Sequence, residues 1–154
     1  MSNLDGVHLS VRSSLPEMQL LGCIASSEIA AQGFAVVLGS LAKRQQVVGY
    51  TLGLAKRGHP EIVSVGGEED DVFGLLTYLA TQVVEHGQVF SEGIHDTPLF
   101  SELVFCDQEA EPHNLPLMEQ VLGDTPVTAL SCIAPRDFTV IQQRPARQDL
   151  RRIA

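Results

Sequence analysis

Residues 66–87 read GGEEDDVFGLLTYLATQVVEHG, and this stretch decides the fold. Four acidic residues, 68–71, stand where the positive end of a helix dipole favours them, and Gly87 supplies a stop. The apolar residues that follow recur at spacings of three and four, which is the spacing of one face of an α-helix. They are Val72, Phe73, Leu76, Leu79, Ala80, Val83 and Val84. The pattern predicts one long helix with one apolar face.

Apolar runs of strand length lie on both sides of this helix. The polar segment Lys43-Arg44-Gln45-Gln46 separates two of the runs and predicts an antiparallel hairpin. Most of the other connections are too short for the crossovers that parallel strands need. The expected strands cover residues 34–38, 47–54, 61–65, 99–106, 125–134 and 138–142.

Two shorter helices complete the expected fold. Met18–Ala25 is an apolar run that we assign to a strand, and Ser26-Ser27-Glu28 then opens a short helix that ends before Gly33. Asn114–Leu122 predicts a second short helix with Asn114 as its cap. The fold class predicted is α+β: a mainly antiparallel sheet with one long and two short helices packed on one face.

Size and composition indicate one globular domain. The chain has 154 residues, of which 44% are hydrophobic and 19% charged. We expect a single α+β domain over residues 1–143 and a basic C-terminal tail over 144–154, which holds four arginines. No apolar run approaches the about 18 residues of a membrane span, and from residues 1–12 we expect no secretion signal. A cytoplasmic location without membrane association is therefore expected.

Residues that commonly bind metals or cofactors form no familiar motif here. Cys23, Cys106 and Cys132 are expected to be reduced, buried thiols that act as small hydrophobic residues. There is no glycine-rich phosphate loop, no nucleophile elbow and no paired-cysteine zinc spacing, so we expect no cofactor and no metal. Four polar residues occur at every second position after an expected strand. They lack the spacing of a calcium loop, so we expect a solvated loop there and not a divalent cation site. They are Asp107, Glu109, Glu111 and His113.

Charge is distributed unevenly along the chain. The formal net charge is −9, and residues 58–135 contain fourteen acidic residues and no lysine or arginine. Such a block disfavours nucleic-acid binding, because affinity for phosphate backbones comes chiefly from lysine and arginine. A basic protein partner or a divalent cation suits it better, although acidic residues that simply keep the domain soluble are the plainer explanation.

One compact motif contains the candidate site residues. It consists of residues 50–54, Tyr-Thr-Leu-Gly-Leu, and residues 58–62, Gly-His-Pro-Glu-Ile. His59 and Glu61 are two apart, so on an extended strand they share a face, and a carboxylate beside an imidazole can orient it for general base work or metal ligation. The same four residues, Gly-His-Pro-Glu, are also typical of a turn.

The residues around His59 and Glu61 are candidates for ligand contact. Tyr50 and Thr51 precede the motif's glycine, and Lys56 and Arg57 lie between its two halves. Together with Gly33-Phe34-Ala35-Val36-Val37 and the long helix, the motif resembles the bacterial family catalogued as domain of unknown function 4262, over about residues 28–143. The resemblance implies a small bacterial cytoplasmic protein and supplies no activity.

Two functions remain open from the sequence. The favoured one is a non-catalytic binding domain that neutralises a basic partner through acidic rim residues. The alternative is a small hydrolase or ligand-binding enzyme with His59 as base or metal ligand and Glu61 as its orienting group. Self-association into a homodimer through strand edges is a third hypothesis. The acidic rim residues are Glu68 to Asp71, Glu92, Asp96 and Glu102.

Overall fold

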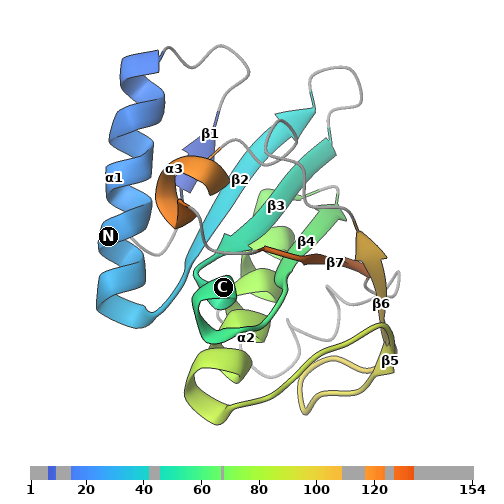
Figure 1. Cartoon of the computed structure of the whole chain (residues 1–154). Coiled ribbons are helices and arrows are strands. Elements are labelled where there is room, and N and C mark those ends of the chain that lie inside the picture. Colours follow the sequence, from blue (N-terminus) through green and yellow to red (C-terminus); the bar gives the residue numbers. More distant parts are fainter. Residues whose placement is uncertain are drawn as a thin grey trace.

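A seven-stranded sheet forms the centre of the molecule, with the strand order β1-β2-β3-β4-β7-β6-β5 (Figure 1). The computed structural model describes residues 7–9, 15–41, 46–66, 68–108, 117–123 and 127–133. The strands are β1 (Val7–Leu9), β2 (Ala35–Leu41), β3 (Gln46–Leu52), β4 (Glu61–Gly66), β5 (Gly93–His95), β6 (Leu103–Gln108) and β7 (Ala129–Ile133).

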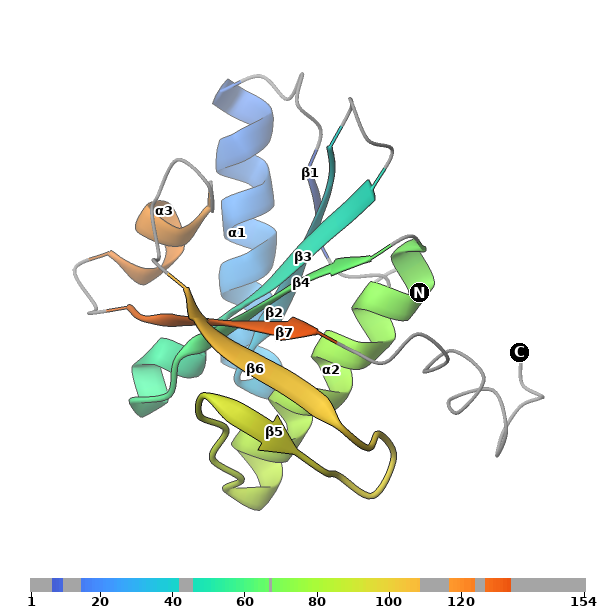
Figure 2. The ribbon, with the colours of Figure 1, turned by 90° about the vertical axis from the view of Figure 1, so that its right-hand side faces the viewer.

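Helices cover both faces of this sheet. Helices α1 (Leu15–Gln32) and α3 (Met118–Leu122) lie on one face, and α2 (Glu69–His86) lies on the other (Figure 2). A short 3₁₀ helix, η2 (Leu54–Arg57), joins β3 to β4. The fold is therefore α+β as predicted, but it has three layers, and the expectation that all helices pack on one face is wrong.

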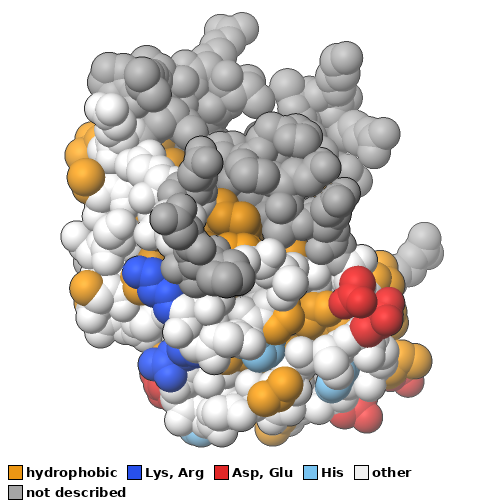
Figure 3. Space-filling model, in the orientation of Figure 1, with side chains coloured by type: hydrophobic (Ala, Val, Ile, Leu, Met, Phe, Trp, Pro, Cys, Tyr) orange, Lys and Arg blue, Asp and Glu red, His pale blue; other side chains and the backbone are white. Residues whose placement is uncertain are grey.

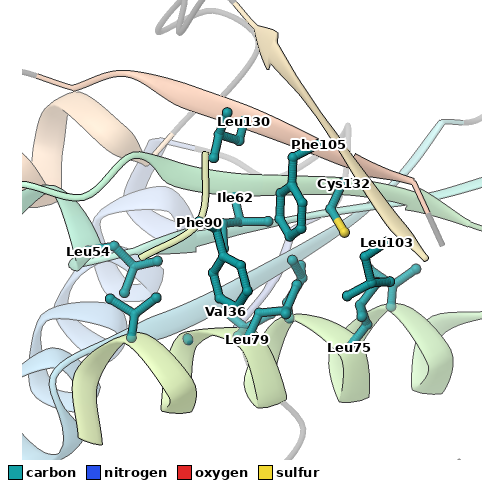
Figure 4. Packing of buried hydrophobic residues seen from close by; sticks show 14 of the residues in the cluster. Val36, Leu54, Ile62, Leu75, Leu79, Phe90, Leu103, Phe105, Leu130 and Cys132 are labelled. Carbon is teal, nitrogen blue, oxygen red and sulfur yellow. The ribbon is translucent and has the colours of Figure 1, made fainter. Parts of the chain in front are cut away.

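The long helix predicted over residues 68–86 is confirmed as α2. Its buried residues face the sheet and meet Phe90 and Phe105 in the larger of two hydrophobic clusters (Figure 4). Gly49 of β3 lets the helix approach, because a Cβ there would lie 2.6 Å from Val72 Cγ1. The buried residues of α2 are Val72, Leu75, Leu76, Leu79, Ala80 and Val83.

Strand pairing is mixed. The predicted hairpin is confirmed, since β2 and β3 pair antiparallel from Ala35↔Leu52 to Leu41↔Gln46. Four of the strand pairs are antiparallel, and two pairs, β1–β2 and β4–β7, are parallel. Antiparallel pairing thus predominates, but the parallel pair β4–β7 lies in the middle of the sheet. It forms because α2, β5, β6 and α3 all intervene between its two strands and allow the chain to return in the same direction.

The first helix differs most from the prediction. We expected a strand over Met18–Ala25 and a short helix over 26–32, whereas Leu15–Gln32 is one helix of 18 residues. Residues with high helix propensity dominate the segment, but its apolar residues are not confined to one face: Ala25 is fully buried and Leu20 is 62% exposed. Because the apolar residues show no helical periodicity, the sequence pattern alone predicts a strand for this run. The described residues therefore form two long helices and one short one.

The remaining predictions have mixed outcomes. The strand over 61–65 is confirmed as β4, and those over 99–106 and 125–134 correspond to the shorter β6 and β7. Cys132 is buried as expected, but Cys23 and Cys106 are exposed. Residues 138–142, the tail 144–154 and Asn114 lie outside the described residues. None of the helices described is long and apolar enough to span a bilayer.

Candidate functional site

The carboxylate of Glu61 is fully buried at the start of β4. Its Oε1 accepts hydrogen bonds from Thr51 Oγ1 at 2.6 Å and from the Leu54 amide at 3.3 Å. Its Oε2 accepts from the amides of Gly53 at 2.8 Å and Ala55 at 3.0 Å. An ionised carboxylate has about four lone-pair sites, so these four donors saturate it.

This arrangement follows from the way η2 begins. The first amides of a helix have no partner within the helix, and an acceptor that faces them stabilises the helix start. Here Glu61, which lies further along the chain, provides that acceptor for three successive amides. Gly53, the N-cap, has φ 119°, and a Cβ there would lie 2.7 Å from the Gly33 carbonyl oxygen. Glycine is therefore required at this position.

Thr51 connects the carboxylate to the sheet. Its hydroxyl donates to Glu61 and accepts from the Ile62 amide at 2.9 Å, and the side chain is fully buried. The ladder between β3 and β4 ends at Tyr50↔Val63, so Thr51 continues the connection beyond the last paired residues. The threonine thus fixes where β3 leaves the sheet and β4 enters it.

The pKa of Glu61 is set by two opposing effects. Burial raises the pKa, and the hydrogen bonds from Thr51, Ala55, Gly53 and Leu54 lower it by a smaller amount, so that the net pKa of Glu61 is about 7. All four partners donate, so the site matches the ionised form of the carboxyl group. No lone pair remains with which Glu61 would take a proton from a substrate.

His59 is also held on both sides. Its Nδ1 lies 2.7 Å from the Pro60 carbonyl oxygen, and its Nε2 lies 2.9 Å from the Phe90 amide nitrogen. A carbonyl oxygen only accepts and an amide only donates, so the imidazole is neutral, with its proton on Nδ1. Burial lowers the pKa of His59, and the bond to Pro60 raises it by less. The ring is 7% exposed and packs edge-on against Phe90.

The bonds of these two residues run in different directions. Glu61 bonds to residues 51–55, whereas His59 bonds to Pro60 and to the segment that follows α2. In the part of the chain that the structure describes, neither residue bonds to the other. Glu61 therefore orients η2, and the Pro60 carbonyl orients the imidazole.

The four candidates for ligand contact divide into two pairs. Tyr50 and Thr51 are buried, and the Tyr50 hydroxyl accepts a hydrogen bond from the Leu117 amide at 3.2 Å, which ties β3 to the start of α3. Burial raises the pKa of Tyr50 well above its usual range. Lys56 and Arg57 are exposed at the end of η2. The motif thus combines a closed interior with two exposed cations.

Sequence reasoning missed the backbone partners of this motif. The amides of residues 53–55 bind Glu61, and Gly53 was the one signal for them, since a conformation with positive φ favours glycine. The amide of Phe90 lies 31 residues from His59 in sequence, and no local pattern indicates that contact.

Acidic and basic residues lie at different ends of β4. We call the end at its first residue, with residues 51–61, the η2 end, and the end where β4 finishes and α2 begins the acidic end. The acidic end comprises Glu68 to Asp71, at the start of α2, together with Asp96 and Glu102. Asp96 follows the last residue of β5 and Glu102 precedes the first residue of β6, and both positions lie beside the end of β7. Glu92 precedes the first residue of β5 and therefore lies at the opposite end of that strand from Asp96.

The two described cations, Lys56 and Arg57, lie at the η2 end. In the view of Figure 3 the lysine and arginine side chains gather on the left and most acidic side chains on the right. In the ribbon of Figure 2, β4 and β7 finish on the right, where α2 starts. The described surface is therefore dipolar.

Metal ligation finds no support in the described residues. They contain no group of three or more His, Cys, Asp or Glu side chains placed to hold a metal ion. Asp107 is exposed near the end of β6, whereas Glu109, Glu111 and His113 lie outside the described residues.

Comparison with known proteins gives one match. A family model described as Domain of unknown function (DUF4262) matches residues 28–142. The match confirms the resemblance inferred from the motif of residues 50–62. No curated protein and no solved structure matches the chain.

Proposed function

We propose that this chain, which belongs to the family described as Domain of unknown function (DUF4262), is a non-catalytic binding domain whose acidic end binds a basic protein partner. The observation that carries the proposal is a contrast within β4. The two candidate catalytic side chains at its start are saturated by hydrogen bonds from their own chain, while the acidic side chains beyond its end include exposed ones.

A general base needs a lone pair within reach of the proton that it abstracts. The lone pair of His59 accepts from the Phe90 amide, and the four sites of Glu61 accept from η2 and Thr51. The hydrogen bonds between either residue and the backbone would have to break before that residue could accept a proton from a substrate. A structural role for both residues supports binding over hydrolysis.

The charge distribution supports a basic partner. Glu68, the N-cap of α2, and Asp70, in its first turn, are exposed. Asp96 and Glu102 are exposed beside the end of β7. Opposite charges on a partner would raise the association rate and select the orientation of the encounter. Because the exposed Lys56 and Arg57 lie at the opposite end, they would orient that end away from the partner.

The test uses the full chain and a synthetic peptide of alternating lysine and glycine as the probe. The association rate is measured by stopped-flow fluorescence as the salt concentration rises from about 0.01 M to about 0.15 M, over which the Debye length falls from about 30 Å to about 8 Å. We expect the rate to fall steeply. A rate that does not depend on salt would overturn the proposal.

A matched pair of double variants locates the binding surface. Glu68→Gln with Asp70→Asn removes two exposed charges at the acidic end, and Glu85→Gln with Glu92→Gln removes two exposed charges elsewhere. Both variants change the net charge equally, so only position distinguishes them. The first is expected to slow association several-fold more than the second, and equal effects would show that net charge alone attracts the peptide.

A further inference from the structure

An apolar row crosses the four strands β4, β7, β6 and β5 on one face of the sheet. Side chains alternate between the two faces along a strand, and residues that pair across strands share a face. Val104 of β6 pairs with Ile94 of β5 and with Ile133 of β7. Val65 and Ile133 each lie two residues beyond the last pair between β4 and β7, so they also share a face. The apolar row consists of Val65, Ile133, Val104 and Ile94.

The apolar row lies on the same face of the sheet as α1 and α3, outside the part that these helices cover. Both neighbours of Val104 in β6 are buried in the cluster beneath α2, so Val104 points to the opposite face. On that face α1 packs on β1 and β2, and α3 packs on β3. Val65, Ile94 and Ile133 are 50%, 71% and 55% exposed. Single exposed apolar residues are normal on a protein surface, whereas a contiguous row is typical of a docking surface.

A crevice interrupts the apolar row between β4 and β7. The two strands pair in parallel up to Val63↔Ser131 and then separate. The crevice between them has a volume of about 130 Å³, and Val65 and Ile133 line it on the face of the row. This volume equals the liquid volume of roughly four water molecules, which is comparable with the four carbon atoms of a leucine side chain. The crevice therefore offers a recess for one aliphatic side chain of a partner.

Exposed carboxylates border the apolar row at both of its ends. Glu68 lies three residues after Val65 in the chain. At the other end, Asp96 lies two residues after Ile94, and its Oδ1 accepts a hydrogen bond from the Glu102 amide at 2.8 Å. Hydrophobic side chains lie beside acidic ones on the right of the view in Figure 3. The carboxylates all lie beyond the ends of strands, so they follow one long side of the row.

The charge of this border selects among the molecules that could cover the row. In a two-fold dimer the same patch meets itself, so a second copy of the chain would bring its own carboxylates against Glu68, Asp96 and Glu102. Like charges that face each other across an interface oppose association. Nucleic acids and anionic membranes carry the same sign of charge and are disfavoured as well. The surface suits a partner segment that has cations beside aliphatic residues.

We propose that the apolar row binds an amphipathic α-helix of the basic partner, with aliphatic side chains on the row and lysine or arginine side chains at Glu68, Asp96 and Glu102. This inference rests on the proposed function and names the segment of the partner that the acidic end binds. Helices α1 and α3 cover the other part of the same face. A helix on the row would extend the same layer over the rest of the sheet.

The length of the row suits a short helix. Three spacings of about 4.8 Å separate β4 from β5, so the row spans roughly 14 Å. Three turns of an α-helix, at about 5.4 Å each, span roughly 16 Å. A helix with one aliphatic residue in each successive turn would therefore meet each strand of the row. Cations on one flank of that helix would face the carboxylates beyond the strand ends.

The test titrates the full chain with two synthetic peptides of the same composition, built from leucine, lysine and alanine. In the amphipathic peptide leucine recurs at helical spacing with lysine beside it, and in the second peptide the order is scrambled. Affinities are measured by isothermal titration calorimetry at a salt concentration of about 0.15 M. The amphipathic peptide is expected to bind at least about tenfold more tightly, because only it presents an aliphatic face. Equal affinities would overturn the proposal.

A matched pair of double variants locates the helix on the row. Ile94→Thr with Ile133→Thr reduces the aliphatic surface and keeps β-branched side chains, which suit strands. Leu20→Gln with Ile24→Gln removes two exposed aliphatic side chains from α1. The first variant is expected to weaken binding of the amphipathic peptide about tenfold, and the second should leave the affinity unchanged. The proposal fails if both variants weaken binding equally.

Two exposed cysteines report whether the row is covered. Cys106 is exposed in β6 on the same face as Val104, and Cys23 is exposed on α1. The amphipathic peptide is expected to slow the reaction of Cys106 with N-ethylmaleimide and to leave that of Cys23 unchanged, as followed by mass spectrometry. If Cys106 of the free chain were already protected, another segment of this chain or, where dilution removes the protection, a second copy would be the occupant. Either result would overturn the proposal.

The lysine and glycine peptide separates this inference from the proposed function. If that peptide binds with the expected salt dependence and the amphipathic peptide binds no more tightly, the acidic end is confirmed as the binding surface and the helix is wrong. If the amphipathic peptide protects Cys106 but its association rate does not depend on salt, the row is a docking surface and the basic partner is wrong.

Discussion

Buried polar side chains at the two ends of β4 differ in their hydrogen bonding. At the η2 end, Thr51, His59 and Glu61 are buried, and each of their polar atoms has a close partner in the chain itself. At the acidic end, Ser64 is equally buried, and its hydroxyl has no partner among the described residues. The difference separates polar side chains whose hydrogen bonds hold the fold together from one whose hydroxyl does not contribute such a bond.

This contrast changes how the motif of residues 50–62 is interpreted. A histidine and a glutamate two residues apart suggest catalysis in a sequence, but their partners decide whether either has a lone pair to use. Here the pair holds η2 and the segment after α2 in place.

The largest expected effect is that of Glu61→Gln. The glutamine has almost the same shape, but its amide nitrogen would face amide donors and leave them without an acceptor. We expect a loss of about 3 kcal/mol in the free energy of unfolding, or roughly 6–12 °C in Tm for a domain of this size. Urea unfolding at pH 8, above the raised pKa of Glu61, measures it.

Glu85→Gln is the control for this change, because Glu85 is exposed near the end of α2 and its replacement should leave stability unchanged. If Glu61→Gln unfolded at the same urea concentration as the wild type, the carboxylate would not be structural, and the distinction between the two ends would fail.

Thr51→Val tests the hydroxyl that joins Glu61 to the sheet. Valine keeps the branched shape and removes both the donor to Glu61 and the acceptor for the Ile62 amide. A loss of about 2 kcal/mol is expected, since two buried groups lose a partner. Thermal unfolding followed by circular dichroism measures the loss, and a value near zero would mean that other groups replace the hydroxyl.

His59→Phe keeps a ring against Phe90 and removes both nitrogens. It leaves the Pro60 carbonyl and the Phe90 amide unpaired, so a loss of about 1.5 kcal/mol is expected at pH 8. The pKa of His59 is lowered in the fold, so its stabilising contribution is present above the unfolded pKa of about 6.5 and is lost as the pH falls through the lower folded pKa.

The stability difference between the wild type and His59→Phe should therefore shrink as the pH falls below 6.5. Unfolding curves at several pH values follow this difference. A difference that grows on acidification would mean that the protonated imidazole is the form that the fold favours, against the hydrogen bond from the Phe90 amide.

Ser64→Ala should have the smallest effect on stability. Its hydroxyl makes no hydrogen bond among the described residues, so its removal costs none. We expect a change of less than about 0.5 kcal/mol in either direction. Set beside Thr51→Val, this variant compares two buried hydroxyls on neighbouring strands, and similar losses in both would show that Ser64 is also structural.

Part of the fold could be predicted because its signals are local. The stripe of α2 and the strands β2, β3 and β4 follow from periodicity and run length, and residues 50–62 stand out as a motif without any knowledge of geometry. α1 could not be predicted in the same way, because its apolar residues do not form one stripe. The parallel pairing of β4 with β7 joins segments separated by more than sixty residues, so no local signal indicates it.

The sequence by itself determined the α+β class, the central helix, the separation of cations from acids and the importance of His59 and Glu61, since composition, periodicity and charge are properties of the chain. Only the tertiary structure decided what these residues do. Hydrogen bonding and burial depend on partners distant in sequence: the Phe90 amide fixes the tautomer of His59, η2 saturates Glu61, and the separation of β4 from β7 leaves Ser64 facing a crevice.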